Sequence, residues 1–121
     1  MDIRNNLPIT SYSSGNVAAA AATATLAAVA GKTTYITGFS ITGAGATAAS
    51  VVNPTITGLL GGTQTYTVAV TAGATLANAP LNVFFDPAIP ASAVNTAIVV
   101  SCPSLGAGNT NNTVNAWGYQ L

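Results

Sequence analysis

Short runs in which apolar and hydroxyl-bearing residues alternate fill the chain from Val17 onwards, and glycine and proline separate them at nearly regular intervals. A period of two places successive side chains on opposite faces of a strand, and such runs bounded by turn residues are typical of antiparallel sheets. The candidate strands are Val17–Val29, Thr33–Thr42, Ser50–Thr57, Thr63–Thr71, Pro80–Phe85, Asn95–Cys102 and Thr110–Leu121. The sequence therefore predicts an all-β fold, a single β-sandwich of either jelly-roll or immunoglobulin-like topology.

The parity of each run predicts which side chains face the core. The expected inner sets are Tyr35, Phe39 and Ile41; Tyr66, Val68 and Val70; Leu81, Val83 and Phe85; and Ile98, Val100 and Cys102. Thr34 has the opposite parity to Tyr35 and is expected to face outward. Cys102, the single cysteine, is expected to behave as a small buried hydrophobe, and it has no partner for a disulfide within the chain.

Two segments carry mixed signals. Five consecutive alanines, followed by Leu26, Val29 and Gly31, suit a helix with a glycine C-cap as well as they suit a strand. Thr23 and Thr25 favour a strand there. Pro54 lies within another run and indicates an edge strand or a bulge, because proline cannot donate to a sheet ladder.

Residues 1–16 show no sustained period and are predicted to form an extended N-terminal arm, with the sandwich domain covering residues 17–121. The arm contains two of the charged residues, and its apolar side chains follow no strand phase. Terminal segments of this kind are commonly mobile until a partner holds them. The candidate partner-binding residues of the arm are Ile3, Arg4, Leu7, Ile9 and Tyr12.

Charge is almost absent from the chain. The charged side chains are Asp2, Arg4, Lys32 and Asp86, and there is no histidine. General acid–base catalysis, nucleophile activation and metal binding all require clusters of histidine, cysteine or carboxylate side chains. Nucleic-acid binding requires clustered lysine and arginine. The composition therefore predicts a protein that is not an enzyme, takes no cofactor or metal, and binds neither nucleic acid nor a membrane.

A neutral surface favours association, because most soluble monomers carry about a quarter charged residues. Polarity here comes instead from 18 threonines, 11 asparagines and 8 serines. We therefore expect much of the surface to be covered by other copies of the chain or by a partner, and we expect a homo-oligomer.

The aromatic residues near the C-terminus have two interpretations. Trp117 and Tyr119 share one strand phase, and together with Tyr12 they would form a sugar-stacking platform beside nearby asparagines. Those asparagines are Asn109, Asn111, Asn112 and Asn115. Aromatic side chains in a terminal strand also serve as core or interface anchors, and this second interpretation is the preferred one.

A resemblance to a known group of proteins rests on three stretches. They are the pattern Leu26, Gly31, Lys32, Tyr35, Ile36, Gly38 and Phe39; the Gly-Ala-Gly-Ala-Thr of residues 43–47; and the ending Trp117, Gly118, Tyr119, Gln120 and Leu121. In these stretches the chain resembles small virion proteins of tailed bacteriophages, most of all the head decoration (cement) proteins. Such proteins are β-sandwiches that bind as trimers to the outside of an assembled capsid.

The resemblance implies a structural virion protein that stabilises the phage head by bridging subunits of the major capsid protein. It implies a homotrimer at the capsid surface, made in the host cytoplasm. The N-terminus lacks the apolar segment of a secretory signal, which agrees with cytoplasmic synthesis. The alternative is a receptor- or glycan-binding module of a phage tail or fibre, because similar domains occur there.

Overall fold

The computed structural model describes residues 9–121, and these residues form strands and turns without a helix. The strands are β1 (Thr10–Ser13), β2 (Ala22–Leu26), β3 (Thr34–Ala44), β4 (Ser50–Val52), β5 (Thr55–Thr57), β6 (Gln64–Thr65), β7 (Val68–Val70), β8 (Leu81–Pro90), β9 (Ile98–Cys102) and β10 (Asn111–Gln120). The prediction of an all-β fold is confirmed.

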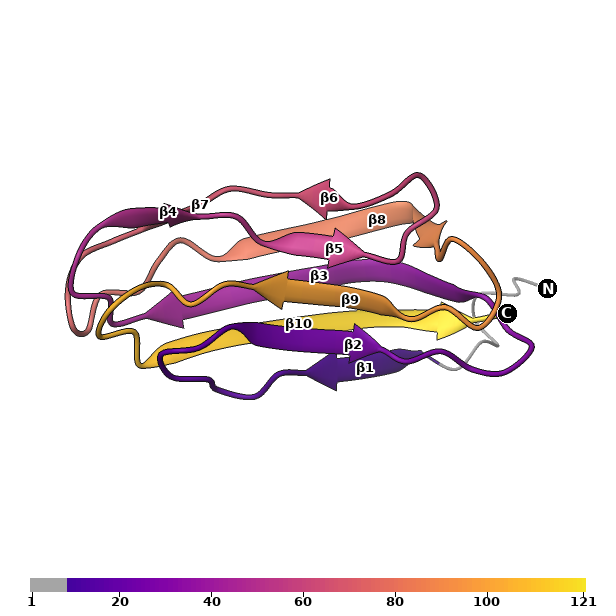
Figure 1. The fold of residues 1–121 in the computed structure, drawn as a ribbon, viewed down its shortest axis with the longest axis horizontal. Coiled ribbons are helices and arrows are strands. Elements are labelled where there is room, and N and C mark those ends of the chain that lie inside the picture. The colour runs from indigo at the N-terminus through magenta and orange to yellow at the C-terminus, as the bar shows by residue number, and fades with distance from the viewer. Residues whose placement is uncertain (1–8) are drawn as a thin grey trace.

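Two four-stranded sheets pack face to face as a sandwich (Figure 1). The first, sheet A, has the strand order β1-β10-β3-β8, and the second, sheet B, has the order β2-β9-β5-β6. A short third sheet pairs β4 with β7 at the end of the sandwich opposite the one where β1 begins and β10 ends. All the strand pairs are antiparallel.

The pairing is nested along the chain. The first strand pairs with the last, β2 pairs with β9, β3 pairs with β8, and the middle strands pair with one another as β4 with β7 and β5 with β6. A long hairpin wrapped in this way into two sheets is the arrangement of a jelly roll, whereas an immunoglobulin-like domain has a different strand order. The strand order thus decides between the two topologies that the sequence left open.

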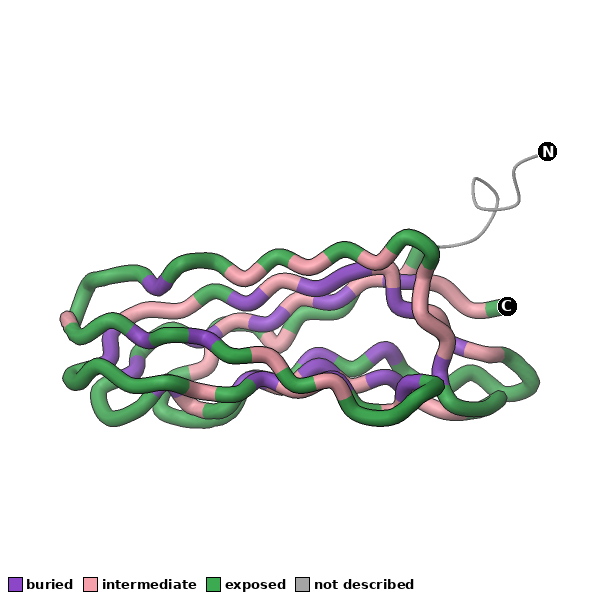
Figure 2. The backbone as a smooth tube through the Cα atoms, turned by 90° about the horizontal axis from the view of Figure 1, so that it is seen from above, coloured by how far each residue is buried: buried purple, intermediate pink, exposed green. Residues whose placement is uncertain are grey.

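The core lies between the sheets, where buried and exposed positions alternate along each strand (Figure 2). In β2, Ala22, Ala24 and Leu26 are buried and the intervening threonines are exposed. The largest fully buried apolar side chains are Phe39, Leu26, Ile36, Ile56, Ile98, Leu105, Val100 and Val114. Tyr66 packs edge-on against Phe39 with 5.2 Å between ring centroids. The core therefore draws on both sheets, as a sandwich requires.

The ambiguous alanine-rich segment is a strand in its second half, β2. Its register with β9 explains this outcome, since Ala24 pairs with Val100 and Leu26 pairs with Ile98. Small alanine side chains leave room for the larger residues of β9 and of the opposite sheet. Tertiary packing has overridden the helix propensity of the alanines.

Pro54 marks a change of sheet, since β4 before it pairs with β7 and β5 after it pairs with β9. Pro87 and Pro90 follow the predicted strand Pro80–Phe85 but lie within β8, which continues to Pro90. The peptide bond between Asp86 and Pro87 is cis. Because β8 is an edge strand of sheet A, a proline there removes no required ladder hydrogen bond.

The parity predicted for the start of β3 is wrong. Thr34 is fully buried and Tyr35 faces outward, because an irregularity between Ile36 and Gly38 reverses the alternation before Phe39. One inserted residue in a strand moves every side chain on one side of it to the opposite face. The inner sets predicted for the later strands are confirmed as buried or half-buried.

The region predicted as an arm contains β1. Thr10–Ser13 pair with β10, and the Ser14 amide donates to the Val114 carbonyl at 2.8 Å. An edge strand held by backbone hydrogen bonds needs no apolar alternation, so the sequence pattern of residues 10–13 did not indicate it. Residues 1–8 of the predicted arm lie outside the described part of the chain.

Cys102 is predicted to be unreactive in the folded protein. Its side chain is buried, and burial raises the pKa of the thiol above its usual value. The thiolate is the reactive form, so reaction with a disulfide reagent such as Ellman's reagent should be slow in buffer and rapid in guanidinium chloride. Equal rates, after correction with free cysteine in both solvents, would contradict the inward position of this side chain.

Gly118 is predicted to be essential for the pairing of β10 with β3. A Cβ atom at this position would collide with the carbonyl oxygen of Tyr35, and neither backbone can move without breaking the ladder. We expect Gly118→Ala to lower the free energy of unfolding by ~3 kcal/mol, measured by chemical denaturation. Thr113→Ala on the same strand is the control, because its side chain is only half-buried, and it should change stability by less than ~0.5 kcal/mol.

Candidate binding surfaces

The outer side of sheet A carries four aromatic side chains, Tyr35, Phe84, Trp117 and Tyr119, which we call the aromatic face. Tyr35 and Tyr119 are direct neighbours on β3 and β10, and their rings stack with 5.1 Å between centroids and 18° between planes. The rings of Phe84 and Trp117 are 5.8 Å apart and inclined by 52°. Phe84 is 73% exposed, so this face presents open aromatic surface to the solvent.

Gly38 makes the contact between Trp117 and Phe84 possible. It lies between them in the sheet, opposite Trp117 on β10 and opposite Phe84 on β8. A Cβ atom at this position would lie 2.8 Å from Cζ2 of Trp117 and 2.8 Å from the carbonyl oxygen of Val83. The indole ring therefore crosses the sheet over a residue without a side chain.

A bulge next to these rings opens the edge of sheet A. Between the pairs Ile36–Ile89 and Gly38–Phe84, β3 has one residue, Thr37, whereas β8 has the segment 85–88. The register of β10 also shifts beside Thr37, and the Thr37 hydroxyl donates to the Trp117 carbonyl at 3.1 Å. Bulges of this kind redirect side chains and occur often beside binding sites.

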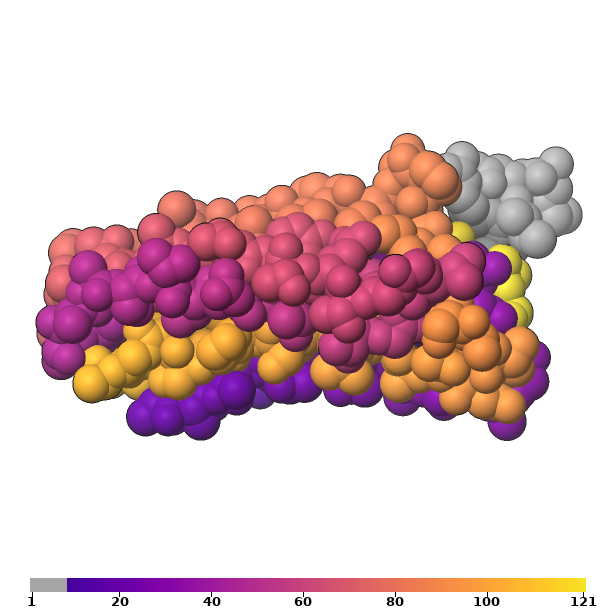
Figure 3. All heavy atoms as spheres, turned by 45° about the horizontal axis from the view of Figure 1, so that its top comes forward, coloured from indigo at the N-terminus to yellow at the C-terminus, as the bar shows by residue number. Residues whose placement is uncertain are grey.

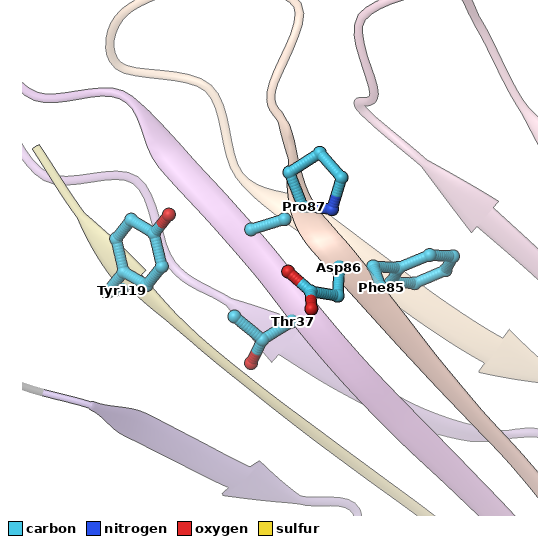
Figure 4. Close-up of a pocket in the computed structure, with 6 residues that line it drawn as sticks. Thr37, Phe85, Asp86, Pro87 and Tyr119 are labelled. Atoms are coloured by element: carbon cyan, nitrogen blue, oxygen red, sulfur yellow. The ribbon is translucent and has the colours of Figure 1, made fainter. Parts of the chain in front are cut away.

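The bulge forms one wall of a pocket with a volume of about 150 Å³. Its lining residues are Thr37, Phe85, Asp86, Pro87, Ala88 and Tyr119. Figure 4 shows the carboxylate of Asp86 directed away from β8 towards the side on which Tyr119 lies. The pocket thus combines apolar walls with a carboxylate and two hydroxyl groups. A second hollow of about 190 Å³, between Thr67–Ala69 and Ala79–Leu81, is lined without aromatic or charged side chains.

Neutral polar side chains continue the outer side of sheet A beyond the aromatic face. Ser13, Asn115, Ser40 and Asn82 lie in register across all four strands of the sheet. The amide of Asn115 donates to the Ser40 hydroxyl at 3.5 Å. Amide and hydroxyl groups both donate and accept hydrogen bonds, so this row can bind a ligand whose groups also donate and accept hydrogen bonds.

Exposed apolar side chains gather at a different place, the end of the sandwich where β1 begins and β10 ends, which we call the terminal end (Figure 1). The loops of residues 27–33, 58–63 and 91–97 meet there, and Figure 3 shows the last two side by side. Backbone hydrogen bonds connect them, from Ser92 to Gly58 at 2.8 Å and from Asn95 to Lys32 at 3.1 Å. The exposed apolar residues in these loops, just before β1 and just after β10 are Ile9, Val29, Leu60, Val94 and Leu121.

The structure separates the residues that the sequence grouped as candidates. Ile3, Arg4 and Leu7 lie outside the described residues. Ile9 is exposed at the terminal end, whereas Tyr12 lies on β1 opposite the inward-facing Ala116 and so points away from the aromatic face. The structure does not bring Tyr12 together with Trp117 and Tyr119.

The asparagine cluster is also divided. Asn109 and Asn112 are buried, and their amides donate to backbone carbonyls, including those of Ala44 and Pro103. Asn109 therefore has a structural role in the loop before β10, and Asn112 has one at the start of β10. Asn115 alone has a half-buried side chain beside the aromatic residues of the outer face.

Tyr35 and Phe84 were missed as surface residues. The alternation predicts Tyr35 in the core, and Phe84 lies between Val83 and Phe85, which are predicted to face inward. Cross-strand pairing brings them beside Trp117 and Tyr119. The double aromatic Phe84-Phe85 was the available signal, because adjacent residues of a strand cannot both face the core.

Within residues 9–121, no group of three or more histidine, cysteine or acidic side chains is close enough to hold a metal ion. No helix in the same range is long and apolar enough to cross a membrane. Comparison of the chain with protein families, with characterised proteins and with solved structures found no significant match. The functional interpretation therefore depends on these surfaces and on the sequence.

Proposed function

We propose that this chain is a non-catalytic structural component of a phage virion, a decoration protein that stabilises the head by bridging subunits of the major capsid protein. The observation that carries the proposal is the gathering of exposed apolar side chains at the terminal end of an almost uncharged sandwich. A surface of this kind suits attachment to another protein surface, which needs complementary shape and little charge.

Two further considerations support the proposal. The sequence resembles phage head decoration proteins in the three stretches quoted above, and jelly-roll sandwiches are common in viral capsid proteins as well as in lectins. Because one fold serves many functions, the surface chemistry supports the proposal more directly than the topology does.

The apolar residues of the terminal end would contribute to attachment by burial. Fully burying an exposed leucine or valine side chain contributes about 1.5–3 kcal/mol, and Leu60 and Val94 are 62% and 50% exposed, so each would contribute roughly half of that range. Lost translational and rotational freedom subtracts ~4–15 kcal/mol, so attachment requires several such side chains and further contacts acting together.

We further propose that the protein forms a homotrimer. A neutral surface favours self-association, and the number of three copies is what the resemblance to head decoration proteins implies. Static light scattering at micromolar concentration should return a mass of three times 11.8 kDa. A mass of 11.8 kDa would contradict the trimer.

Attachment through the terminal end predicts a specific loss of binding. Leu60→Ser combined with Val94→Ser should reduce co-sedimentation with phage heads at least tenfold, which corresponds to about 1.4 kcal/mol. Val51→Ser is the matched control, because Val51 is also exposed but belongs to β4 at the opposite end. Binding that is lost equally in both proteins, or in neither, would contradict attachment through this end. The heads should come from the phage whose genome encodes the chain.

The N-terminal segment is predicted to contribute to the same attachment. Deleting residues 2–8 leaves β1 in place, so the protein should remain folded by circular dichroism but bind heads less tightly. Deleting residues 2–15 also removes β1 and should lower the thermal midpoint. Undiminished binding of the shorter deletion would assign the contact wholly to the sandwich.

A further inference from the structure

The outer side of sheet A is chemically different from the terminal end, which it borders where Tyr119 lies two residues before Leu121. It combines open aromatic rings, a pocket with a carboxylate, and a row of amide and hydroxyl side chains. We propose that this side binds a neutral oligosaccharide. One sugar ring occupies the pocket beside Thr37, Asp86 and Tyr119, and the next ring stacks on the pair Phe84–Trp117.

The size of the pocket supports a single ring. Its volume of about 150 Å³ matches that of an engineered protein cavity that admits benzene, a six-membered ring. It is smaller than the roughly 300–1,000 Å³ typical of sites for drug-sized molecules. A pyranose ring fits a space of this size, and the open side leaves room for glycosidic links to neighbouring sugars.

The groups around the pocket match the two kinds of surface on a sugar. A pyranose has faces of C–H groups and an edge of hydroxyl groups. The negative face of an aromatic ring attracts weakly positive C–H groups, which suits Tyr119 as one wall. A carboxylate group can accept more than one hydrogen bond, so Asp86 can take one from a sugar hydroxyl in addition to its interaction within the chain.

The arrangement along β10 extends the site beyond one ring. Trp117 lies two residues before Tyr119, about 7 Å along the strand, a distance comparable with the length of one pyranose residue. Asn115 lies a further two residues away, in the polar row that also contains Ser40 and Asn82. An oligosaccharide laid along the strand direction would meet rings first and then hydrogen-bonding groups.

The same observations disfavour other occupants. The four strands of sheet A carry no lysine or arginine side chain that could bind an anionic ligand. A partner protein would leave the amides and hydroxyls of the polar row in need of matching groups, since a buried polar group without a partner is unfavourable. A neutral ligand rich in hydroxyl groups satisfies both parts of the face.

Titration followed by NMR tests the proposal on the full chain. The probes are maltotetraose, cellotetraose, mannotetraose and N,N′,N″,N‴-tetraacetylchitotetraose, with sialyllactose as the charged comparator and tetramethylammonium as the cationic one. We expect at least one neutral tetrasaccharide to shift the backbone amides of Thr37, Phe84 and Tyr119 at millimolar concentration. It should also change the fluorescence of Trp117, the single tryptophan of the chain.

Variants separate stacking from folding. Phe84→Ala and Tyr119→Ala should each weaken binding about tenfold, which corresponds to ~1.4 kcal/mol, whereas Tyr119→Phe should retain most of it because the ring remains. Val51→Ala is the control, since its exposed side chain lies outside both surfaces. Amide spectra of each variant show whether it remains folded, and Phe84 is exposed enough for its removal to leave the core intact.

Several results would overturn the proposal. The first is the absence of shifts with all four neutral probes at about 10 mM, a limit corresponding to roughly −2.7 kcal/mol. The others are shifts confined to another face of the protein, binding of a charged comparator alone, and wild-type affinity for the sugar in Phe84→Ala. The proposed attachment to phage heads is tested separately through Leu60 and Val94. Loss of sugar binding and loss of head binding are therefore distinguishable outcomes.

Discussion

The pairing of β3 with β10 supports both sides of sheet A. Inward, this ladder contributes Ile36, Phe39 and Val114 to the core, and outward it presents the stacked pair Tyr35 and Tyr119. Glycine permits the close approach in both directions. Gly118 brings β10 against the Tyr35 carbonyl, and Gly38 lets the Trp117 ring cross towards β8. The irregularity at Thr37 shifts the register of β3. As a result, the residues of β3 before Thr37 have the opposite inward and outward alternation to those after it.

The scarcity of charge has a structural consequence as well as a functional one. Burying an ionised group away from water is unfavourable unless it is paired, so charged surfaces are difficult to cover with a partner. Here the terminal end offers apolar side chains and the outer side of sheet A offers rings, amides and hydroxyls. In the functions proposed above, the first surface binds another protein and the second binds a hydroxyl-rich ligand. The two surfaces meet where β10 ends, since Tyr119 belongs to the aromatic face and Leu121 to the terminal end.

The sequence indicates two residues of the candidate site, Trp117 and Tyr119, but not the other side chains that form it. Trp117 and Tyr119 share one strand phase in the sequence, which suits either a sugar platform or an interface anchor. The pairing of β10 with β3, and of β3 with β8, places Tyr35 and Phe84 beside Trp117 and Tyr119. Tyr12 points away from this face, and Asn109 and Asn112 are buried. The three strands β3, β8 and β10 are separated by dozens of residues in the chain, and no local period reports which strand lies beside which. The pocket depends on the bulge of residues 85–88, which the sequence suggested only as a turn near two prolines.

Alternation by itself determined that the chain is all-β, where most strands lie, and which side of the later strands faces the core, because the side-chain parity of a strand is a local property. Composition by itself determined the near-absence of charge and hence the chemistry that the surface lacks. Only the tertiary structure decided the jelly-roll order, the strand at residues 10–13 and the reversed parity of Tyr35. Each of these depends on hydrogen bonds between residues far apart in sequence, and a single inserted residue at Thr37 is enough to exchange the inner and outer faces of a strand.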